Sequence, residues 1–149
     1  MEFVRVDEEN LLEAGAVHAA SWRESHRAVC SADFVAEHTP QRQAEYLRRE
    51  MAAGKQVFML VDEEIVGVVS IQGSLIENLY VHPSFWRCGY GSALLMHAQS
   101  HCIGTPSLWI LSSNTPAKRL YEKHGYLPTG RVKLLSDTLF EIEMQKKNR

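Results

Sequence analysis

Short runs of apolar residues, many of them β-branched, recur along this chain and predict strands. Residues 3–6 alternate as "FVRV", and residues 56–73 hold two such runs on either side of the polar turn "DEE". A third run fills residues 74–83 and ends at a proline. Consecutive strands joined by short polar turns commonly pair as an antiparallel meander. We therefore predict a separate first strand and then a meander between residues 56 and 83.

Helical spacing of apolar residues marks four other segments. Residues 7–26 open with an aspartate cap, and residues 39–54 open with Thr39 as a cap, continue with a proline and end at a glycine. Caps of this kind satisfy free N–H groups at the start of a helix, and glycine ends a helix at low cost. Residues 91–102 have the same spacing, and residues 114–125 run from an asparagine cap to a glycine stop. The chain is thus predicted to form about four helices.

The remaining apolar runs complete the predicted sheet. Residues 106–113 form a short apolar run typical of a buried strand, and residues 126–135 and 138–145 predict a closing hairpin. No repeat, linker or low-complexity segment interrupts the order, so residues 1–149 are expected to form a single domain. Strands and helices in this series predict an α/β fold of the α+β kind, with a mixed, mostly antiparallel sheet of about seven strands.

Composition excludes several classes of partner. With 149 residues, 45% of them hydrophobic, the chain can bury a core without disulfide or metal support. Sixteen basic and eighteen acidic residues give a net charge of −2, so we expect no nucleic-acid partner. The three cysteines lie far apart, which favours free thiols and a cytoplasmic location. The first residues lack signal-peptide features and no window reaches the roughly 18 apolar residues of a membrane helix, so no membrane association is expected.

Two glycines lie where the third meander strand passes into a helix. Gly89 and Gly91 stand within "LYVHPSFWRCGYGSALLMHA", residues 79–98. Free N–H groups at a helix start carry a partial positive charge, and small residues let a phosphate approach them. The glycine pair alone leaves a simple tight turn open as an alternative. Neither a G-x-x-x-x-G-K-[ST] run nor a G-x-G-x-x-G fingerprint is present, so nucleoside triphosphates and NAD are less favoured.

Two motifs together carry a resemblance to a known family. Residues 114–126, "NTPAKRLYEKHGY", resemble the signature Asn-x-x-Ala-x-x-x-Tyr-x-x-x-Gly-Phe/Tyr. Residues 86–91, "WRCGYG", resemble the turn Gln/Arg-x-x-Gly-x-Gly/Ala, with Trp86 as the one departure. With the order of elements, these motifs resemble the GNAT superfamily of acetyl-CoA-dependent N-acetyltransferases. Every fixed position of the first signature is met, by Asn114, Ala117, Tyr121, Gly125 and Tyr126.

The resemblance implies that acetyl-CoA is the cosubstrate. It places the pyrophosphate on backbone N–H groups from about Arg87 to Ser92, and the pantetheine arm along the preceding strand, with the amide near Val81 as a donor to the thioester oxygen. A packed core strand and a simple helix cap remain compatible roles for the same residues. The candidate coenzyme-binding residues are Leu79, Tyr80, Val81, Arg87, Cys88, Gly89, Tyr90, Gly91, Ser92, Asn114, Ala117 and Tyr121.

The implied reaction is direct acetyl transfer to a primary amine. It needs a neutral amine, a donor to the oxyanion and a proton for the departing sulfur. Tyr121 lies about two helical turns after Asn114, on the same face, so its phenol is the candidate acid. A packed core aromatic is the alternative role for Tyr121. A non-catalytic acyl-CoA-binding module is the rival function, and a nucleotide-binding protein is a third.

Glu77 is the first candidate for the base that deprotonates the amine. Strand alternation predicts that its side chain shares a face with Leu79 and Val81, next to the proposed coenzyme contacts. A solvent-facing glutamate is the alternative. Several family members carry their catalytic glutamate nearer the position of Leu75, which weakens this assignment. Two weaker candidates are His82 and Glu24.

The acceptor site is expected between the first two helices. Residues 21–34, "SWRESHRAVCSADF", mix aromatic, charged and small side chains across a helix break. Trp22, Glu24 and His26 are the candidate acceptor contacts, with a core position as the alternative for Trp22. The acceptor itself, a small-molecule amine or a protein amine, stays open. So does the oligomeric state, with a homodimer among the possibilities.

A histidine pair is the remaining candidate for metal chemistry. His97 and His101 are spaced i,i+4, followed by Cys102, which a helix could present to a metal. No third ligand is evident, and Leu94 and Leu95 occupy the opposite side of the predicted helix. We therefore expect a polar outer helix face and no metal site.

Overall fold

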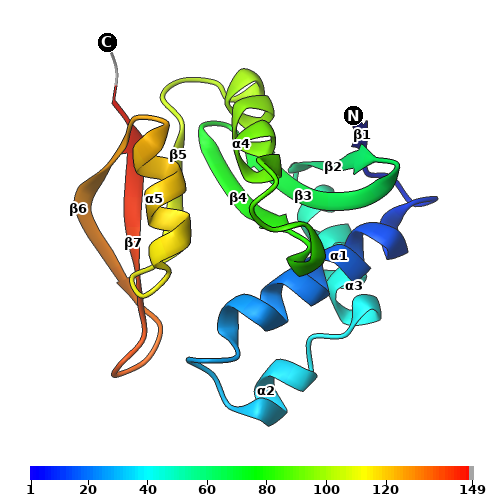
Figure 1. The fold of residues 1–149 in the computed structure, drawn as a ribbon, viewed down its shortest axis with the longest axis horizontal. Coiled ribbons are helices and arrows are strands. Elements are labelled where there is room, and N and C mark those ends of the chain that lie inside the picture. The colour runs from blue at the N-terminus through cyan, green and yellow to red at the C-terminus, as the bar shows by residue number, and fades with distance from the viewer. Residues whose placement is uncertain (148–149) are drawn as a thin grey trace.

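One seven-stranded sheet organises the chain in the computed structural model, which describes residues 1–147 (Figure 1). The strand order is β1-β2-β3-β4-β5-β7-β6, and every neighbouring pair is antiparallel except β4 and β5. This confirms the predicted mixed, mostly antiparallel sheet. The strands are β1 (Glu2–Arg5), β2 (Gln56–Asp62), β3 (Glu64–Gln72), β4 (Leu75–Val81), β5 (Ser107–Leu111), β6 (Tyr126–Leu134) and β7 (Phe140–Lys146).

Helices cover both faces of the sheet (Figure 1). One apolar cluster joins the sheet to α4 and α5, and a second joins its other face to α1 and α3. Strand alternation makes this division: Leu60 lies in the first cluster and its neighbour Met59 in the second. No helix within residues 1–147 has the length and apolar character needed to cross a membrane. The helices are α1 (Leu11–His26), α2 (Ala32–Ala36), α3 (Pro40–Ala52), the 3₁₀ turn η1 (Pro83–Phe85), α4 (Tyr90–His101) and α5 (Thr115–Lys123).

The sheet splits between β4 and β5. These two parallel strands pair only at their first residues, Leu75 with Ser107 and Ile76 with Leu108. Beyond this point the strands diverge, as Figure 1 shows between the green and yellow-green ribbons. From Glu77 onward β4 therefore has β3 on one side and no strand on the other. The unpaired edge of β4 is available for hydrogen bonding to something other than the sheet.

A β-bulge interrupts β4 at the start of this unpaired edge. Ser70 of β3 lies opposite Glu77, but Val68 lies opposite Tyr80, so β4 carries one extra residue. Asn78 at the bulge has a φ of +53°, in the left-handed region that asparagine tolerates better than most residues. A bulge of this kind breaks the alternation of side chains and strengthens the twist of the strand. It therefore changes which residues of β4 face α1 and α3.

The helix ends agree with the sequence except around α1 and α2. Thr39 caps α3 as predicted, accepting from the Arg42 N–H at 3.1 Å. Helix α1 begins at Leu11 instead of residue 7, because the Asp7 carboxylate accepts from the N–H groups two and three residues ahead and closes a turn there. The structure has five α-helices in its described part, one more than predicted. The extra one, α2, has five residues, too few to show helical periodicity in the sequence.

Candidate active site

The segment that leads into α4 presents a row of unpaired backbone donors. Gly89 is the N-cap of α4, and the helix begins at Tyr90. None of the six backbone N–H groups from Arg87 to Ser92 donates to an acceptor within residues 1–147. Donors of this kind at a helix start, where the helix dipole adds positive potential, form a binding site for an anion. We call this row, residues 87–92, the cradle.

The two glycines of the cradle are required for different reasons. Gly89 has a φ of +85°, and a Cβ there would meet no atom within 4 Å, so only its backbone conformation favours glycine. Gly91 has no such φ, but a Cβ on it would lie 3.1 Å from Cδ2 of Leu120 in α5. Gly89 thus makes the turn, while Gly91 lets the start of α4 pack close to α5.

Side chains of the cradle anchor it to the rest of the molecule. The Tyr90 hydroxyl donates to Oδ2 of Asp62 at 2.6 Å, and this hydrogen bond raises the pKa of Tyr90 to about 12. Ser92 Oγ lies 2.9 Å from Nε2 of His124 at the end of α5. Cys88 is an exposed free thiol. Because these side chains bond elsewhere or face solvent, the cradle offers mainly backbone atoms to a ligand.

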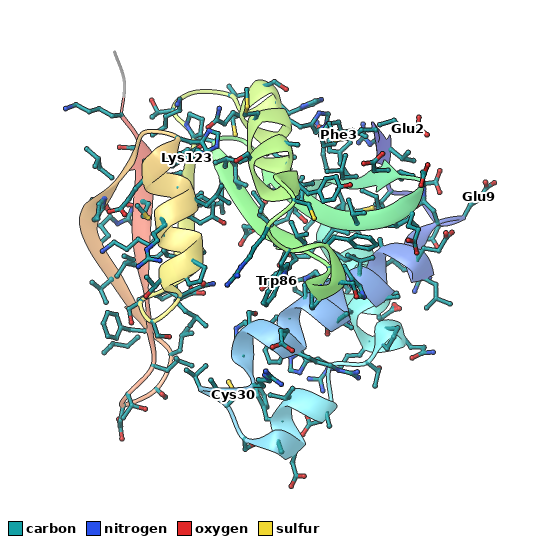
Figure 2. All side chains as sticks on the ribbon, in the orientation of Figure 1. Glu2, Phe3, Glu9, Cys30, Trp86 and Lys123 are labelled. Atoms are coloured by element: carbon teal, nitrogen blue, oxygen red, sulfur yellow. The ribbon has the colours of Figure 1, made fainter. Side chains whose placement is uncertain are left out.

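Next to the cradle, the backbone of Val81 faces the split in the sheet. His82 N–H donates to the Val66 carbonyl of β3, so the N–H and C=O of Val81 point to the other side of β4. The Val81 carbonyl accepts from Ser21 Oγ at 3.0 Å and from Nε1 of Trp86 at 2.7 Å (Figure 2 labels Trp86 beside the end of β4). The Val81 N–H has no acceptor within residues 1–147. A ligand that pairs with this edge finds a free donor and a carbonyl that the indole already occupies.

The signature at residues 114–126 lies across the split from β4. The Tyr121 ring is 6% exposed, and its hydroxyl makes no hydrogen bond within residues 1–147. Burial raises the pKa of Tyr121, so the phenol stays protonated at neutral pH. Burial also raises the pKa of Tyr80, and Tyr121 adds to that rise, which places the two phenols near one another. Asn114 caps α5, its Oδ1 accepting from the Ala117 N–H at 3.2 Å, as the sequence predicts.

A cavity of about 370 Å³ opens on the α1 and α3 face of the sheet. Residues of β4, β5, β6 and β7 complete its lining, so it extends beside the split. Of the three predicted acceptor contacts, Trp22 and His26 line this cavity. Glu24 does not: it pairs with Arg27 at 2.9 Å. We call this cavity the acceptor pocket.

Trp22 lies in a stack of aromatic rings at the wall of the acceptor pocket. Its indole lies between the rings of His26 and His38, with centroid distances of 4.0 and 3.5 Å. Phe34 of α2 meets the indole edge-on at 5.8 Å. Burial lowers the pKa of His26, which favours its neutral form. Trp22 is therefore a half-buried wall residue and not part of the core.

Glu77 lies on the opposite face from the one predicted. The bulge directs its side chain toward α3, where it pairs with Lys55, which also pairs with Glu50. Leu79 and Val81 pack instead against the cluster under α4 and α5. The prediction that all three share a face is wrong, because simple alternation does not hold across a bulge. Glu77 nevertheless lines the acceptor pocket.

A buried histidine network that the sequence did not indicate holds the bulge in place. His18 is 1% exposed; its Nε2 lies 3.2 Å from Oδ1 of Asn78, and its Nδ1 lies 2.9 Å from Nε2 of Gln43. An amide oxygen accepts and an amide nitrogen donates, so His18 is the neutral tautomer protonated on Nε2. Burial lowers the pKa of His18 to about 4, consistent with this neutral form. Asn78 also donates to Ser70 Oγ at 3.3 Å.

Comparison with known proteins identifies the family. The family model described as "Acetyltransferase (GNAT) family" matches residues 19–126. The chain belongs to this family. No curated protein matches the sequence. As a GNAT acetyltransferase the protein is an enzyme whose cosubstrate is acetyl-CoA, and the resemblance inferred from the two motifs is confirmed.

Several solved structures share the whole fold. PaiA N-acetyltransferase from Thermoplasma acidophilum, in complex with coenzyme A, is 18% identical with a TM-score of 0.73, over 99% of this chain and 98% of that one. YjaB from Escherichia coli is 18% identical with a TM-score of 0.69, over 99% and 98% of the two chains. Spermidine N-acetyltransferase SpeG from Vibrio cholerae is 14% identical with a TM-score of 0.71, over 98% and 94%. At these identities the likeness establishes the fold alone.

Of the two histidines predicted on a polar outer helix face of this GNAT protein, His101 is exposed as predicted, but His97 is half-buried. His97 stacks on Phe3 of β1 at a centroid distance of 3.9 Å and meets Phe58 of β2 edge-on at 4.6 Å. Burial lowers the pKa of His97. The prediction is wrong for His97 because the Phe3 side chain of β1 stacks on it, a contact that helical periodicity does not show. Residues 1–147 contain no group of three or more His, Cys, Asp and Glu placed to hold a metal.

Proposed function

We propose that this GNAT acetyltransferase moves the acetyl group of acetyl-CoA directly to the primary amine of a small molecule in the acceptor pocket. The observation that carries the proposal is the continuity of two features: six unpaired N–H groups at residues 87–92, and the unpaired edge of β4 beside them. A diphosphate requires several donors, and an amide-containing arm requires a strand edge. Residues of β4 also line the pocket that holds Trp22 and Glu77.

In this proposal the cradle binds the pyrophosphate through its backbone donors, and Arg87 adds a positive charge. The β4 edge then aligns the arm of the coenzyme along Leu79, Tyr80 and Val81. The N–H of Val81, which is free, donates to the thioester oxygen and stabilises the negative charge that forms there. Preorganised donors of this kind lower the barrier because they need no reorientation during the reaction.

Two side chains move protons in the proposed step. The amine nitrogen bonds to the thioester carbonyl carbon, the carbon–sulfur bond breaks, and the Tyr121 hydroxyl gives its proton to the departing sulfur. Glu77 takes the proton of the amine, directly or through a water molecule. Its carboxylate shares Lys55 with Glu50, so it is not neutralised by a dedicated partner. His18 does not suit this role, because both of its ring nitrogens are already hydrogen-bonded.

A free-thiol assay with a broad panel of primary amines tests the proposal. We expect release of coenzyme A with at least one amine, and the Glu77→Gln variant should lower kcat by about 10²-fold, the usual contribution of a general base. Acetyl-CoA binding without release of thiol from any amine would contradict the proposal and favour a non-catalytic acyl-CoA-binding module. Loss of activity in Glu77→Gln through misfolding is recognised by a fall in melting temperature.

We also propose that the protein acts in the cytoplasm, without nucleic acid and as a homodimer. Three free cysteines suit a reducing compartment, and the near balance of charge suits a partner other than a polyanion. Strand β6 lies at the end of the strand order and exposes apolar side chains from which a second copy could gain contact. Sedimentation analysis that finds only monomers at micromolar concentration would contradict the dimer. The exposed residues are Leu127, Val132 and Leu134.

A further inference from the structure

We infer that the acceptor is a primary amine that also carries an anionic group such as a carboxylate. Its amine faces Glu77 at the inner part of the acceptor pocket, and its anionic group meets Arg49 and Lys133 at the exposed part. This inference rests on the proposed function, because it assigns the chemical class of the acceptor in the same pocket. It follows from which charged side chains along the pocket wall have a salt-bridge partner and which do not.

The inner part of the pocket carries an excess of negative charge. Glu77 and Glu50 both pair with the single ammonium of Lys55, whose side chain is 11% exposed. The two carboxylates and one ammonium sum to about one net negative charge. Tyr46 adds no charge, since its neutral hydroxyl donates to Glu50 at 3.1 Å. Charges in a partly buried site are screened less than charges on the surface. Amines are mostly protonated at neutral pH, so this part of the pocket attracts the ammonium form of an acceptor.

Two positive side chains that form no salt bridge within residues 1–147 line the exposed part of the pocket, one from each of two walls. Arg49 projects from α3 and Lys133 from β6, and both line the pocket. Neither lies within 4.0 Å of a carboxylate of residues 1–147, whereas Arg42, which also lines the pocket, is held by Glu37 at 3.1 Å. Arg49 is exposed along with its pocket-lining neighbours Arg42 and Lys133. A guanidinium without a partner offers a two-pronged donor set that fits a carboxylate or a related anion.

Lys133 has a neighbour of opposite charge, which makes Arg49 the principal anion-binding residue. Glu141 lies opposite Lys133 in the pairing of β6 with β7, and it lines the same wall. The ammonium of Lys133 lies 4.4 Å from the centre of the Trp109 ring, so the aromatic face holds it in position. Glu141 offsets much of the positive field of Lys133, so Arg49 makes the direct contact with the anionic group.

The same charges disfavour other amines. A volume of about 370 Å³ lies at the small end of ligand pockets, so it suits a small molecule. A polyamine would bring a second and a third positive charge close to Arg49 and Lys133, and repulsion would weaken its binding. An amine that carries no anionic group would leave Arg49 without a partner. The pocket thus selects for a positive and a negative group in one small molecule.

Matched pairs of acceptors test this inference. The panel contains the common α-amino acids, β-alanine and 4-aminobutyrate, each beside its carboxamide, together with spermidine. We expect thiol release from at least one amino acid, with a KM at least about tenfold below that of its carboxamide, as for the loss of a charge-assisted hydrogen bond. Arg49→Gln should raise the KM for the amino acid by a similar factor and leave the KM for its carboxamide unchanged.

Arg48→Gln is the matched control, because it removes the same charge from the next residue of α3. Arg48 pairs with Glu8 and Glu45 and does not line the pocket, so its loss should change neither KM. Equal or faster turnover of carboxamides or spermidine would overturn the inference. So would an equal change in KM for both members of a pair in Arg49→Gln.

A binding measurement separates failure of this inference from failure of the proposed function. Calorimetric titration of the amino acids and carboxamides into the protein saturated with coenzyme A needs no turnover. If no amine releases thiol but an amino acid binds, and Arg49→Gln abolishes that binding, the inference holds while the proposed catalysis fails. If no amino acid binds better than its carboxamide, the inference is overturned whether or not other amines react.

Discussion

At the scale of single residues, Trp86 lies at the edge of β4 along which the coenzyme arm is proposed to bind in this GNAT protein. It stands where the family turn has glutamine or arginine, and its indole donates to the Val81 carbonyl on the open edge of β4. An arm that pairs with this edge must first displace the indole. The residue that departs from the family turn is therefore also the residue that occupies the Val81 carbonyl.

Replacing this indole should strengthen coenzyme binding. In Trp86→Gln we expect the Kd for acetyl-CoA to fall by about fivefold, because displacing one net hydrogen bond costs roughly 1 kcal/mol. Isothermal titration calorimetry measures the change. Weaker binding in Trp86→Gln would mean instead that the indole moves onto the coenzyme and contributes to its affinity.

Tyr121 is the residue at which chemistry and packing are most easily confused. Tyr121→Phe keeps the buried ring and removes only the hydroxyl, so we expect kcat to fall by about 10²-fold with the affinity for acetyl-CoA unchanged. Tyr126→Phe is the control: its hydroxyl donates to Gln99 at 2.8 Å outside the groove. That change should cost about 1 kcal/mol of stability and leave kcat intact. Equal kinetic losses in the two variants would show that Tyr121 acts only by packing.

At the scale of elements, the turn before α4 sets the direction of the cradle donors. Gly89→Ala puts a Cβ at a φ of +85° without a clash, so we expect a loss of about 1–2 kcal/mol in stability and weaker coenzyme binding. Gly130→Ala in β6 is a close match, because its φ is +93° and nothing lies within 4 Å. It should lose similar stability and bind the coenzyme normally. Chemical denaturation measures the change in stability, and calorimetry measures the change in coenzyme binding. Normal coenzyme binding in Gly89→Ala would argue against the cradle as the pyrophosphate site.

The bulge of β4 depends on contacts from another element, and this makes stability depend on pH. His18 has a pKa of about 4 when folded and about 6.5 when unfolded, so the unfolded chain takes up the proton first as pH falls. The free energy of unfolding should therefore fall between pH 6.5 and pH 4, by roughly 3 kcal/mol from this group, and not change from it above pH 6.5. His18→Gln should flatten much of this slope. An unchanged slope in urea denaturation would exclude His18 as its main source.

Local signals in the sequence predicted the elements, but not what holds them in register. Thr39 and Asn114 cap their helices as predicted, because a cap depends only on the next three residues. The bulge at Asn78 depends on His18, sixty residues away, so alternation placed Glu77 on the wrong face. His97 was likewise misplaced, since Phe3 of the first strand covers it. The cradle was predictable as a glycine turn and the acceptor site as lying between the first two predicted helices, whereas the residues of α3 that line the pocket were not predicted.

At the scale of the whole molecule, the split between β4 and β5 divides the sheet into two parts that the coenzyme is proposed to join. A ligand that contacts both parts stabilises the folded state by its binding free energy. Acetyl-CoA at 100 times its Kd should add about 2.7 kcal/mol, which corresponds to roughly 5–10 °C in melting temperature. ATP and NAD at the same concentration should give no shift. Protection by either nucleotide without protection by acetyl-CoA would favour a nucleotide-binding protein.

A crystal structure with acetyl-CoA bound tests the central claim most directly. The account predicts pyrophosphate oxygens within hydrogen-bonding distance of the N–H groups of residues 87–92, the thioester oxygen at the N–H of Val81, and the Trp86 indole displaced from the Val81 carbonyl. A coenzyme bound elsewhere, with the indole still in place and those N–H groups facing only solvent, would contradict it.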